Sequence, residues 1–197
     1  MNAIVYLHGF RSSPASKKAQ VVEAAVAELP AATRPQLFVP TLTDRPAVAI
    51  AGVVDWVARH ADPARLTFIG SSLGGYYATH LAERFGARAA LVNPTTRPYD
   101  DLAQWRGVQT NLYTGEAFEV TDEHFEELRA LRVPRITRPE RYFLLVETGD
   151  EVLDYRLAVA FYGGAWQYVR GGGDHTFQDF GAQVPAILRF AGVEAAA

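Results

Sequence analysis

A glycine- and serine-rich turn lies between a strand-like and a helix-like stretch, and it constrains the fold more than any other feature. Residues 70–74 read Gly-Ser-Ser-Leu-Gly, which is a G-x-S-x-G pattern centred on Ser72. In a turn of this kind the central serine is held in a strained conformation that exposes its hydroxyl, and side chains at the flanking glycines would obstruct the turn. The same pattern also occurs in ordinary turns, so its meaning depends on the rest of the chain.

Apolar runs of strand length alternate with helix-like segments along the chain. Helical spacing of apolar residues predicts helices over 17–29, 122–131 and 154–162. A further helix is expected to begin at an Asp44 cap, with Pro46 in its first turn, and another to run from the serine turn to a glycine cap at Gly86. The last helix is expected around Phe180 to Leu188, with Pro185 in its first turn. The predicted strands are 3–7, 36–39, 65–69, 87–92, 141–146 and 165–169.

This alternation predicts an α/β fold with a mainly parallel, doubly wound sheet of about six strands and helices on both faces. The length of 197 residues suits one domain that spans the whole chain, 1–197. From about 95 to 140 the periodicity is lost and prolines and glycines are frequent. Because long irregular segments in small domains are usually functional or mobile, we expect a lid-like insertion there.

Composition excludes several classes of function. The net charge of -3 gives no reason to expect a nucleic acid or an anionic membrane as partner. The chain has no cysteine, and its histidines do not show an H-x-x-x-H spacing, so we expect no disulfide, no metal and no cofactor. The N-terminus lacks the features of a signal peptide, and no apolar run approaches the ~20 residues of a membrane helix, so a cytoplasmic protein is expected.

Three side chains with complementary chemistry follow predicted strands. Ser72 comes after the third strand, Asp150 after the fifth and His175 after the sixth. A serine hydroxyl needs a base to become a nucleophile, and the histidine needs a carboxylate to orient it. The carboxyl ends of parallel strands share one edge of the sheet, and the chain order Ser, Asp, His is that of the α/β-hydrolase architecture. We therefore predict a catalytic triad.

Each role has competitors. Ser71 would require a turn shifted by one residue, which would lose both glycines. Glu151, Asp154 and Asp174 compete with Asp150, although Asp154 suits a helix cap and Asp174 a role within its own loop. Among the other histidines, His8 is expected to pin the loop after the first strand, and the remainder are expected on the surface or in packing: His60, His80 and His124.

The substrate-binding groups are less well defined by sequence. The backbone amides of Leu73 and Phe10 are expected to form the oxyanion hole, with Arg11 behind Phe10. Arg11, Tyr76 and Trp105 are candidate substrate contacts, with core or lid packing as the alternative for the two aromatic residues and a solvated side chain as the alternative for Arg11. Three further aromatic side chains are expected either to shape an acyl pocket or to pack in the core: Tyr77, Tyr99 and Phe118. Arg97, a second loop arginine, is a candidate contact for an anionic substrate group.

The chain resembles the YqiA-type small esterases of the α/β-hydrolase superfamily. The resemblance rests on Tyr-Leu-His-Gly-Phe-Arg-Ser-Ser-Pro at 6–14, Gly-Ser-Ser-Leu-Gly-Gly-Tyr-Tyr-Ala at 70–78, Leu-Val-Asn-Pro at 91–94, Tyr-Thr-Gly-Glu at 113–116, Thr-Gly-Asp-Glu-Val-Leu-Asp-Tyr at 148–155 and Gly-Gly-Asp-His-Thr-Phe at 172–177. It implies a compact α/β-hydrolase fold that lacks the first two strands, and hydrolysis of acyl esters by Ser72, His175 and Asp150.

The sequence thus predicts a serine hydrolase of short acyl esters, with a small-molecule substrate and no nucleic acid or membrane as partner. Acyl-CoA thioesters are the nearest alternative substrate, although no basic patch for the CoA phosphates is evident. Cofactor-free C–C cleavage or perhydrolysis would use the same triad. The alternative of a different class is a non-catalytic binding or interaction scaffold. The presence of all three triad residues argues against it, because a scaffold does not need them together. The oligomeric state is left open.

Overall fold

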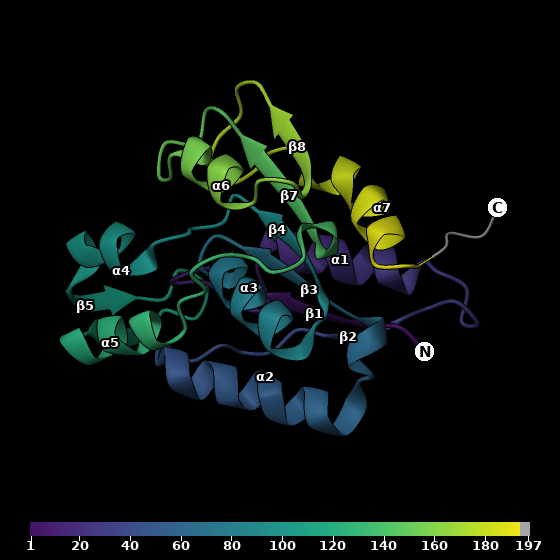
Figure 1. Cartoon of the computed structure of the whole chain (residues 1–197). Coiled ribbons are helices and arrows are strands. Elements are labelled where there is room, and N and C mark those ends of the chain that lie inside the picture. The colour runs from purple at the N-terminus through teal and green to yellow at the C-terminus, as the bar shows by residue number, and fades with distance from the viewer. Residues whose placement is uncertain (194–197) are drawn as a thin grey trace.

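Six strands form a fully parallel sheet at the centre of the computed structural model, which describes residues 1–193 (Figure 1). The strand order across the sheet is β2-β1-β3-β4-β7-β8. The predicted strands are confirmed to within a residue or two at each end. Their bounds are Ala3–Leu7 for β1, Gln36–Phe38 for β2, Leu66–Ser71 for β3, Arg88–Val92 for β4, Tyr142–Glu147 for β7 and Trp166–Arg170 for β8.

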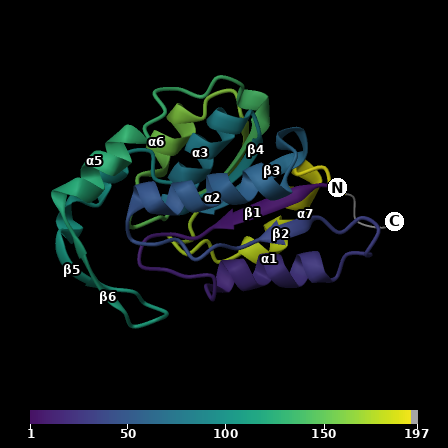
Figure 2. The same ribbon diagram turned by 90° about the horizontal axis from the view of Figure 1, so that it is seen from below.

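The central strands are mostly apolar because both faces of the sheet are covered. Every residue of β1 and β3 is buried. One apolar core contains side chains of α2, α3, α5 and α6, and the other contains those of α1 and α7 on the opposite face (Figure 2). The bounds of these helices are Lys17–Ala27 for α1, Pro46–His60 for α2, Leu73–Phe85 for α3, Asp122–Ala130 for α5, Tyr155–Phe161 for α6 and Phe180–Phe190 for α7.

Two of the predicted helix ends are confirmed. Gly86 ends α3 in the left-handed conformation, with φ 65°, which a glycine adopts without strain. Asp154 begins α6, and its carboxylate accepts the N–H of Arg156.

Two other local predictions are wrong. Asp44 does not cap α2, because Pro46 occupies the first helical position and Arg45 therefore holds the cap. Pro185 does not lie in the first turn of α7, which already begins at Phe180. Phe180 and Val184 lie one turn apart and are both buried, so packing extends the helix ahead of the proline.

The insertion after β4 is more regular than its sequence indicates. It holds the short helix α4, Pro98–Asp101, and an antiparallel hairpin of β5, Gly107–Thr110, and β6, Ala117–Val120, before α5. The sequence did not reveal the hairpin, because its strands are only four residues long and, apart from the buried Val120, alternate between exposed and half-buried positions with little apolar contrast. The β5–β6 hairpin and α5 lie beyond the carboxyl end of β1 (Figure 2).

Candidate active site

Ser72 occupies the sharp turn between β3 and α3. Its backbone has φ 55° and ψ -120°, a conformation that a non-glycine residue rarely adopts. A methyl group on Gly70 would lie 2.2 Å from the Gly74 carbonyl oxygen, and one on Gly74 would lie 2.0 Å from that of Leu7. Gly70 is therefore required for the turn to close on the start of α3, and Gly74 for α3 to pack against the end of β1.

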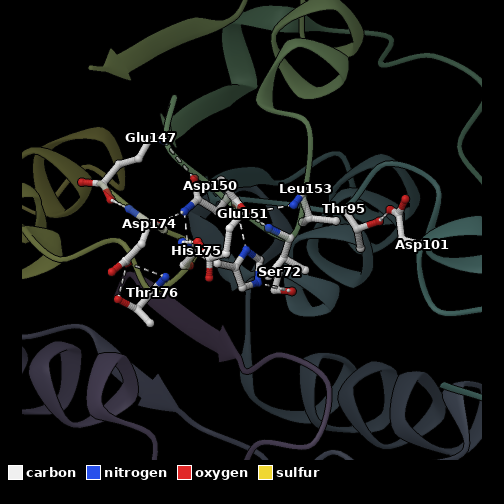
Figure 3. Close-up of polar contacts among 12 residues, drawn as sticks. Ser72, Thr95, Asp101, Glu147, Asp150, Glu151, Leu153, Asp174, His175 and Thr176 are labelled. Carbon is white, nitrogen blue, oxygen red and sulfur yellow. Dashed lines mark hydrogen bonds and ion pairs between the residues drawn. The ribbon is translucent and has the colours of Figure 1, made fainter. Parts of the chain in front are cut away.

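His175 connects Ser72 to Asp150 through two hydrogen bonds (Figure 3). Its Nδ1 lies 2.8 Å from Asp150 Oδ2, and its Nε2 lies 3.1 Å from Ser72 Oγ. An ionised carboxylate only accepts, so this arrangement places the proton on Nδ1 and directs the Nε2 lone pair at the serine hydroxyl. The structure thus brings the three predicted triad residues together from three different strand ends.

Asp150 is well suited to hold the imidazole. Its side chain is 2% exposed, and its Oδ1 accepts the N–H groups of Val152 and Leu153 at 2.9 and 2.8 Å. One carboxylate oxygen therefore fixes the turn after β7 while the other faces His175.

The competing carboxylates have other partners. Glu151 accepts the backbone N–H of His175 at 3.0 Å, so it holds the loop and not the imidazole. Asp174 accepts from Thr176 and Gln178 within its own loop, and the bond from Thr176 is the main cause that lowers the pKa of Asp174. Ser71 is the last residue of β3 and is buried.

The two backbone amides predicted for the oxyanion hole belong to segments next to Ser72. Leu73 is the first residue of α3, where an N–H has no acceptor within its own helix, and Phe10 lies in the turn after β1. Within residues 1–193, neither N–H has a protein acceptor. Gly9 brings this turn against the serine, since a methyl group on Gly9 would lie 3.3 Å from Ser72 Cβ.

His8 pins the loop after β1, as the sequence predicts. Its Nδ1 donates to the Gly9 carbonyl at 3.1 Å, and its Nε2 accepts the Leu42 N–H at 3.2 Å. These two partners select the neutral Nδ1-H tautomer, and burial lowers the pKa of the imidazole.

A cleft of about 480 Å³ lies beside the serine turn. Phe10 and Leu73, which carry the two amides, line this cleft, whereas the three triad side chains do not. Its walls come from the turn after β1, the segment that leads into α2 and the β5–β6 hairpin, and they mix apolar and polar side chains. The lining includes Phe10, Arg11, Leu42, Asp44, Leu73, Tyr77, Asn111, Glu116 and Phe118. A space of this size and composition suits a small organic ligand.

The predicted substrate contacts fall in different places. Arg11 lines the cleft, but its Nε donates to the Thr110 carbonyl at 2.9 Å and its guanidinium lies 5.1 Å from the Trp105 ring centre. Trp105 supports the cleft from behind, packed edge-on against Phe10. Tyr76 is 5% exposed, and its hydroxyl donates to the Leu128 carbonyl, so it packs between α3 and α5 and does not line the cleft.

The other candidate side chains divide in the same way. Tyr77 and Phe118 line the cleft. Tyr99 packs against the core beneath Arg129, and Arg97 pairs with Asp100 at 2.7 Å. His124 is buried, and its Nε2 lies 3.4 Å from the Asp44 carboxylate. His80 lies 3.0 Å from the Leu131 carbonyl, while His60 ends α2 in an exposed position.

Neither a metal cluster nor a membrane-crossing segment is found in the described part of the chain. Residues 1–193 contain no group of three or more His, Cys, Asp and Glu side chains placed to hold a metal. No helix in the same range is long and apolar enough to span a membrane.

Sequence reasoning missed two buried polar residues beside the triad. Asn93 directly follows β4 and Glu147 is the last residue of β7, and both contact the loop that carries His175. The sequence signal that could have identified Asn93 is its position in an Asn-Pro pair directly after the apolar run of β4.

The sheet order, the strained serine turn and the triad geometry define the class of α/β-hydrolase-fold proteins. The mouse alpha/beta hydrolase domain-containing protein 10 superposes with a TM-score of 0.68 at 16% identity, covering 94% of this chain and 87% of that one. The esterase domain of a Rhodothermus marinus protein superposes with a TM-score of 0.70 at 17% identity, covering 96% and 86%. At such identities the likeness shows the fold alone.

The chain belongs to the uncharacterised protein family UPF0227, whose family model matches residues 3–192. This match confirms the resemblance to YqiA-type proteins drawn from the sequence. A curated relative, the pimeloyl-[acyl-carrier protein] methyl ester esterase of Vibrio campbellii, is 34% identical over 93 residues. The match covers 43% of this chain and 36% of the relative's length.

Proposed function

We propose that this protein is a serine hydrolase of carboxylic esters, in which Ser72 is the nucleophile, His175 the general base and Asp150 the acid that orients it. The observation that carries the proposal is the continuous hydrogen-bonded chain from Asp150 through His175 to the hydroxyl of a serine held in a strained turn. Local strain that the surroundings maintain is typical of functional sites.

Acylation follows from these positions. Ser72 Oγ attacks the ester carbonyl while His175 Nε2 takes the hydroxyl proton. The carbonyl oxygen becomes an oxyanion, which the N–H groups of Leu73 and Phe10 stabilise. The tetrahedral intermediate then collapses, the C–O bond to the alcohol breaks, and the Nε2 proton passes to the departing alkoxide.

Deacylation follows the same steps with water as the nucleophile. His175 removes a proton from a water molecule, which attacks the acyl carbon, and the second tetrahedral intermediate releases the carboxylic acid as Ser72 regains its proton. Throughout, Asp150 stabilises the imidazolium that forms at each proton transfer.

The ester class is supported by the Vibrio campbellii relative, whose name describes a methyl ester esterase. The cleft of about 480 Å³ has room for a short acyl chain or a small alcohol. Acyl-CoA is a less suitable substrate, because the carboxylates of Asp44 and Glu116 share the cleft with Arg11 and give the CoA phosphates little net attraction. We therefore place short acyl esters first.

The test compares the wild type with Ser72→Ala, using a fluorophosphonate probe and p-nitrophenyl acetate and butyrate. The wild type should label and turn over, and Ser72→Ala should lose labelling and lower kcat by at least about 10⁴-fold. Ser71→Ala is the matched control and should still label. An acyl-ester and acyl-CoA chain-length series then separates the two substrate classes. A wild type that neither labels nor turns over would contradict the proposal and favour a binding scaffold.

A further inference from the structure

The turn that follows β4 lies between the other two segments of the site. In the sheet, β4 is flanked by β3, which leads to Ser72, and by β7, which leads to Asp150. The Val92 carbonyl accepts the Ser72 N–H at 3.0 Å, and the Thr95 N–H donates to the Ser72 carbonyl at 3.3 Å. Asn93 and Pro94 lie between Val92 and Thr95, so Asn93 is attached through its neighbours to the backbone of the serine turn.

Asn93 itself bonds to the other two segments. Its N–H donates to the Leu145 carbonyl of β7 at 2.9 Å, and its Oδ1 accepts the Glu147 N–H at 3.0 Å. Its Nδ2 donates to the carbonyls of Asp174 and His175 at 3.0 and 3.2 Å. The side chain is buried, and the backbone has φ 40°, a conformation that asparagine tolerates better than most residues. Both polar atoms of the amide are thus used on triad-bearing segments.

The loop that carries His175 needs such external support. It follows Gly171, Gly172 and Gly173, of which the last two have positive φ, and glycines leave a free chain many accessible conformations. By holding the carbonyls on both sides of the His175 backbone, Asn93 fixes the peptide planes that determine the direction of its Cα–Cβ bond.

Glu147 supports the same loop from behind. Its carboxylate is fully buried, accepts the Asp174 N–H at 2.9 Å and pairs with Arg170 at 2.9 Å. A methyl group on Gly173 would lie 2.0 Å from Glu147 Oε2, so the loop rests directly on this carboxylate. Asn93 and Glu147 therefore bind Asp174, the residue before His175, at its carbonyl and at its N–H.

We propose that Asn93 is a positioning residue of the active site, which sets the imidazole of His175 in register with Ser72 Oγ and Asp150 Oδ2. The inference rests on the proposed serine-hydrolase function and deepens it. Asn93 does not touch the reacting atoms; it acts through the backbone of the His175 loop, and its loss should reduce catalysis more than substrate binding.

Two variants test this role. Asn93→Gly removes the side chain but tolerates the positive φ, and Asn93→Asp retains an acceptor for the Glu147 N–H while losing both donors to the loop. A displaced base lowers kcat by about 10²-fold, so we expect that loss in both variants, with KM little changed. The control is Asn2→Gly, since Asn2 also donates its Nδ2 to a backbone carbonyl, that of Gly192 at 2.7 Å, outside the active site. It should retain full kcat.

Two readouts separate positioning from folding. Active-site titration with the fluorophosphonate probe counts competent enzyme, so kcat is referred to folded molecules. The low-field NMR resonance of the His175 Nδ1 proton reports its bond to Asp150, and it should shift or broaden in both Asn93 variants while remaining unchanged in Asn2→Gly.

The outcomes are distinct. If the wild type is active, and Asn93→Gly has the same kcat per titrated site and the same Nδ1 resonance as the wild type, the inference is overturned and the proposed function is left intact. A loss of activity explained entirely by fewer titratable sites would overturn it as well. A wild type that is unlabelled and silent would remove the proposed function, and the inference with it.

Discussion

At the scale of single residues, the triad carboxylate has two duties that other side chains cannot take over. Asp150 Oδ1 closes the turn after β7 and Oδ2 meets His175, while Glu151 beside it holds only the loop backbone. The difference between two adjacent acids is therefore one of direction and not of charge.

Asp150→Asn should lower kcat by about 10⁴-fold with little change in KM, because an amide supports the wrong imidazole tautomer and cannot stabilise the imidazolium. Glu151→Gln is the matched control: its amide oxygen can still accept the His175 N–H, so kcat should stay near that of the wild type. Steady-state ester hydrolysis measures both. Equal losses in the two variants would contradict the assignment of the acid.

At the scale of elements, the serine turn depends on close contact between α3 and β1. Gly74→Ala should lower the free energy of unfolding by about 3 kcal/mol, because its methyl group would overlap the Leu7 carbonyl and the backbone on both sides cannot retreat. Gly52→Ala in α2 is the control, since a methyl group there meets nothing within 4 Å and should add about 0.5–1 kcal/mol. Urea unfolding at equilibrium compares them, and equal effects would refute the contact argument.

The β5–β6 hairpin is tied to the turn that carries the Phe10 amide. The Leu112 N–H donates to the Arg11 carbonyl, Arg11 Nε donates to the Thr110 carbonyl, and Asn111 Nδ2 donates to the Ser12 carbonyl, each at 2.9 Å. The insertion thus supports the candidate oxyanion loop as well as forming one wall of the cleft.

Asn111→Ala should therefore lower kcat/KM by about tenfold, equivalent to roughly 1.4 kcal/mol of transition-state stabilisation, because the turn beside Ser72 loses an anchor. Hydrogen exchange should quicken across the hairpin. Val108→Thr, on the same hairpin at a position 73% exposed, is the control and should leave both unchanged. A wild-type kcat/KM in Asn111→Ala would show that the hairpin does not act on the site.

At the scale of the whole molecule, two histidines are shielded from water by the packing of the fold: His8 after β1 is buried, and His80 in α3 is half-buried. Burial lowers the pKa of His8 and of His80, against a smaller opposing effect of the backbone carbonyls of Gly9 and Leu131. Both side chains are therefore neutral in the folded protein at pH values where the unfolded chain begins to bind protons.

This difference predicts an acid loss of stability. Above the unfolded pKa of about 6.5 both states are neutral and the contribution is complete. As the pH falls below that value the unfolded chain takes up protons first, so the free energy of unfolding decreases until the pH passes the lowered folded pKa values. In the double variant His8→Gln/His80→Gln, the free energy of unfolding measured by urea titration should change less between pH 7 and 5 than in the wild type or in the control His60→Gln. A slope as steep as that of the wild type would contradict the prediction.

The sequence was sufficient for the features that depend on local chemistry. Apolar runs and helical spacing located every strand of the parallel sheet, and glycines around Ser72 marked the turn where side chains are excluded. The order of Ser72, Asp150 and His175 after strand ends followed from the geometry of parallel sheets, which brings those ends to one edge.

Only the tertiary structure decided the rest, because those features depend on partners distant in sequence. Short hairpin strands with little apolar contrast are specified by their contacts with Arg11 and Ser12, not by their own pattern. From the sequence Tyr76 suits either the core or an acyl pocket, and its hydrogen bond to the Leu128 carbonyl of α5 places it in the core. Asn93 resembled an ordinary strand terminator, and its position between three triad-bearing segments arises only when β4 is inserted between β3 and β7. Local pattern thus determined which residues can form the site, and the packing of the sheet determined which ones support it.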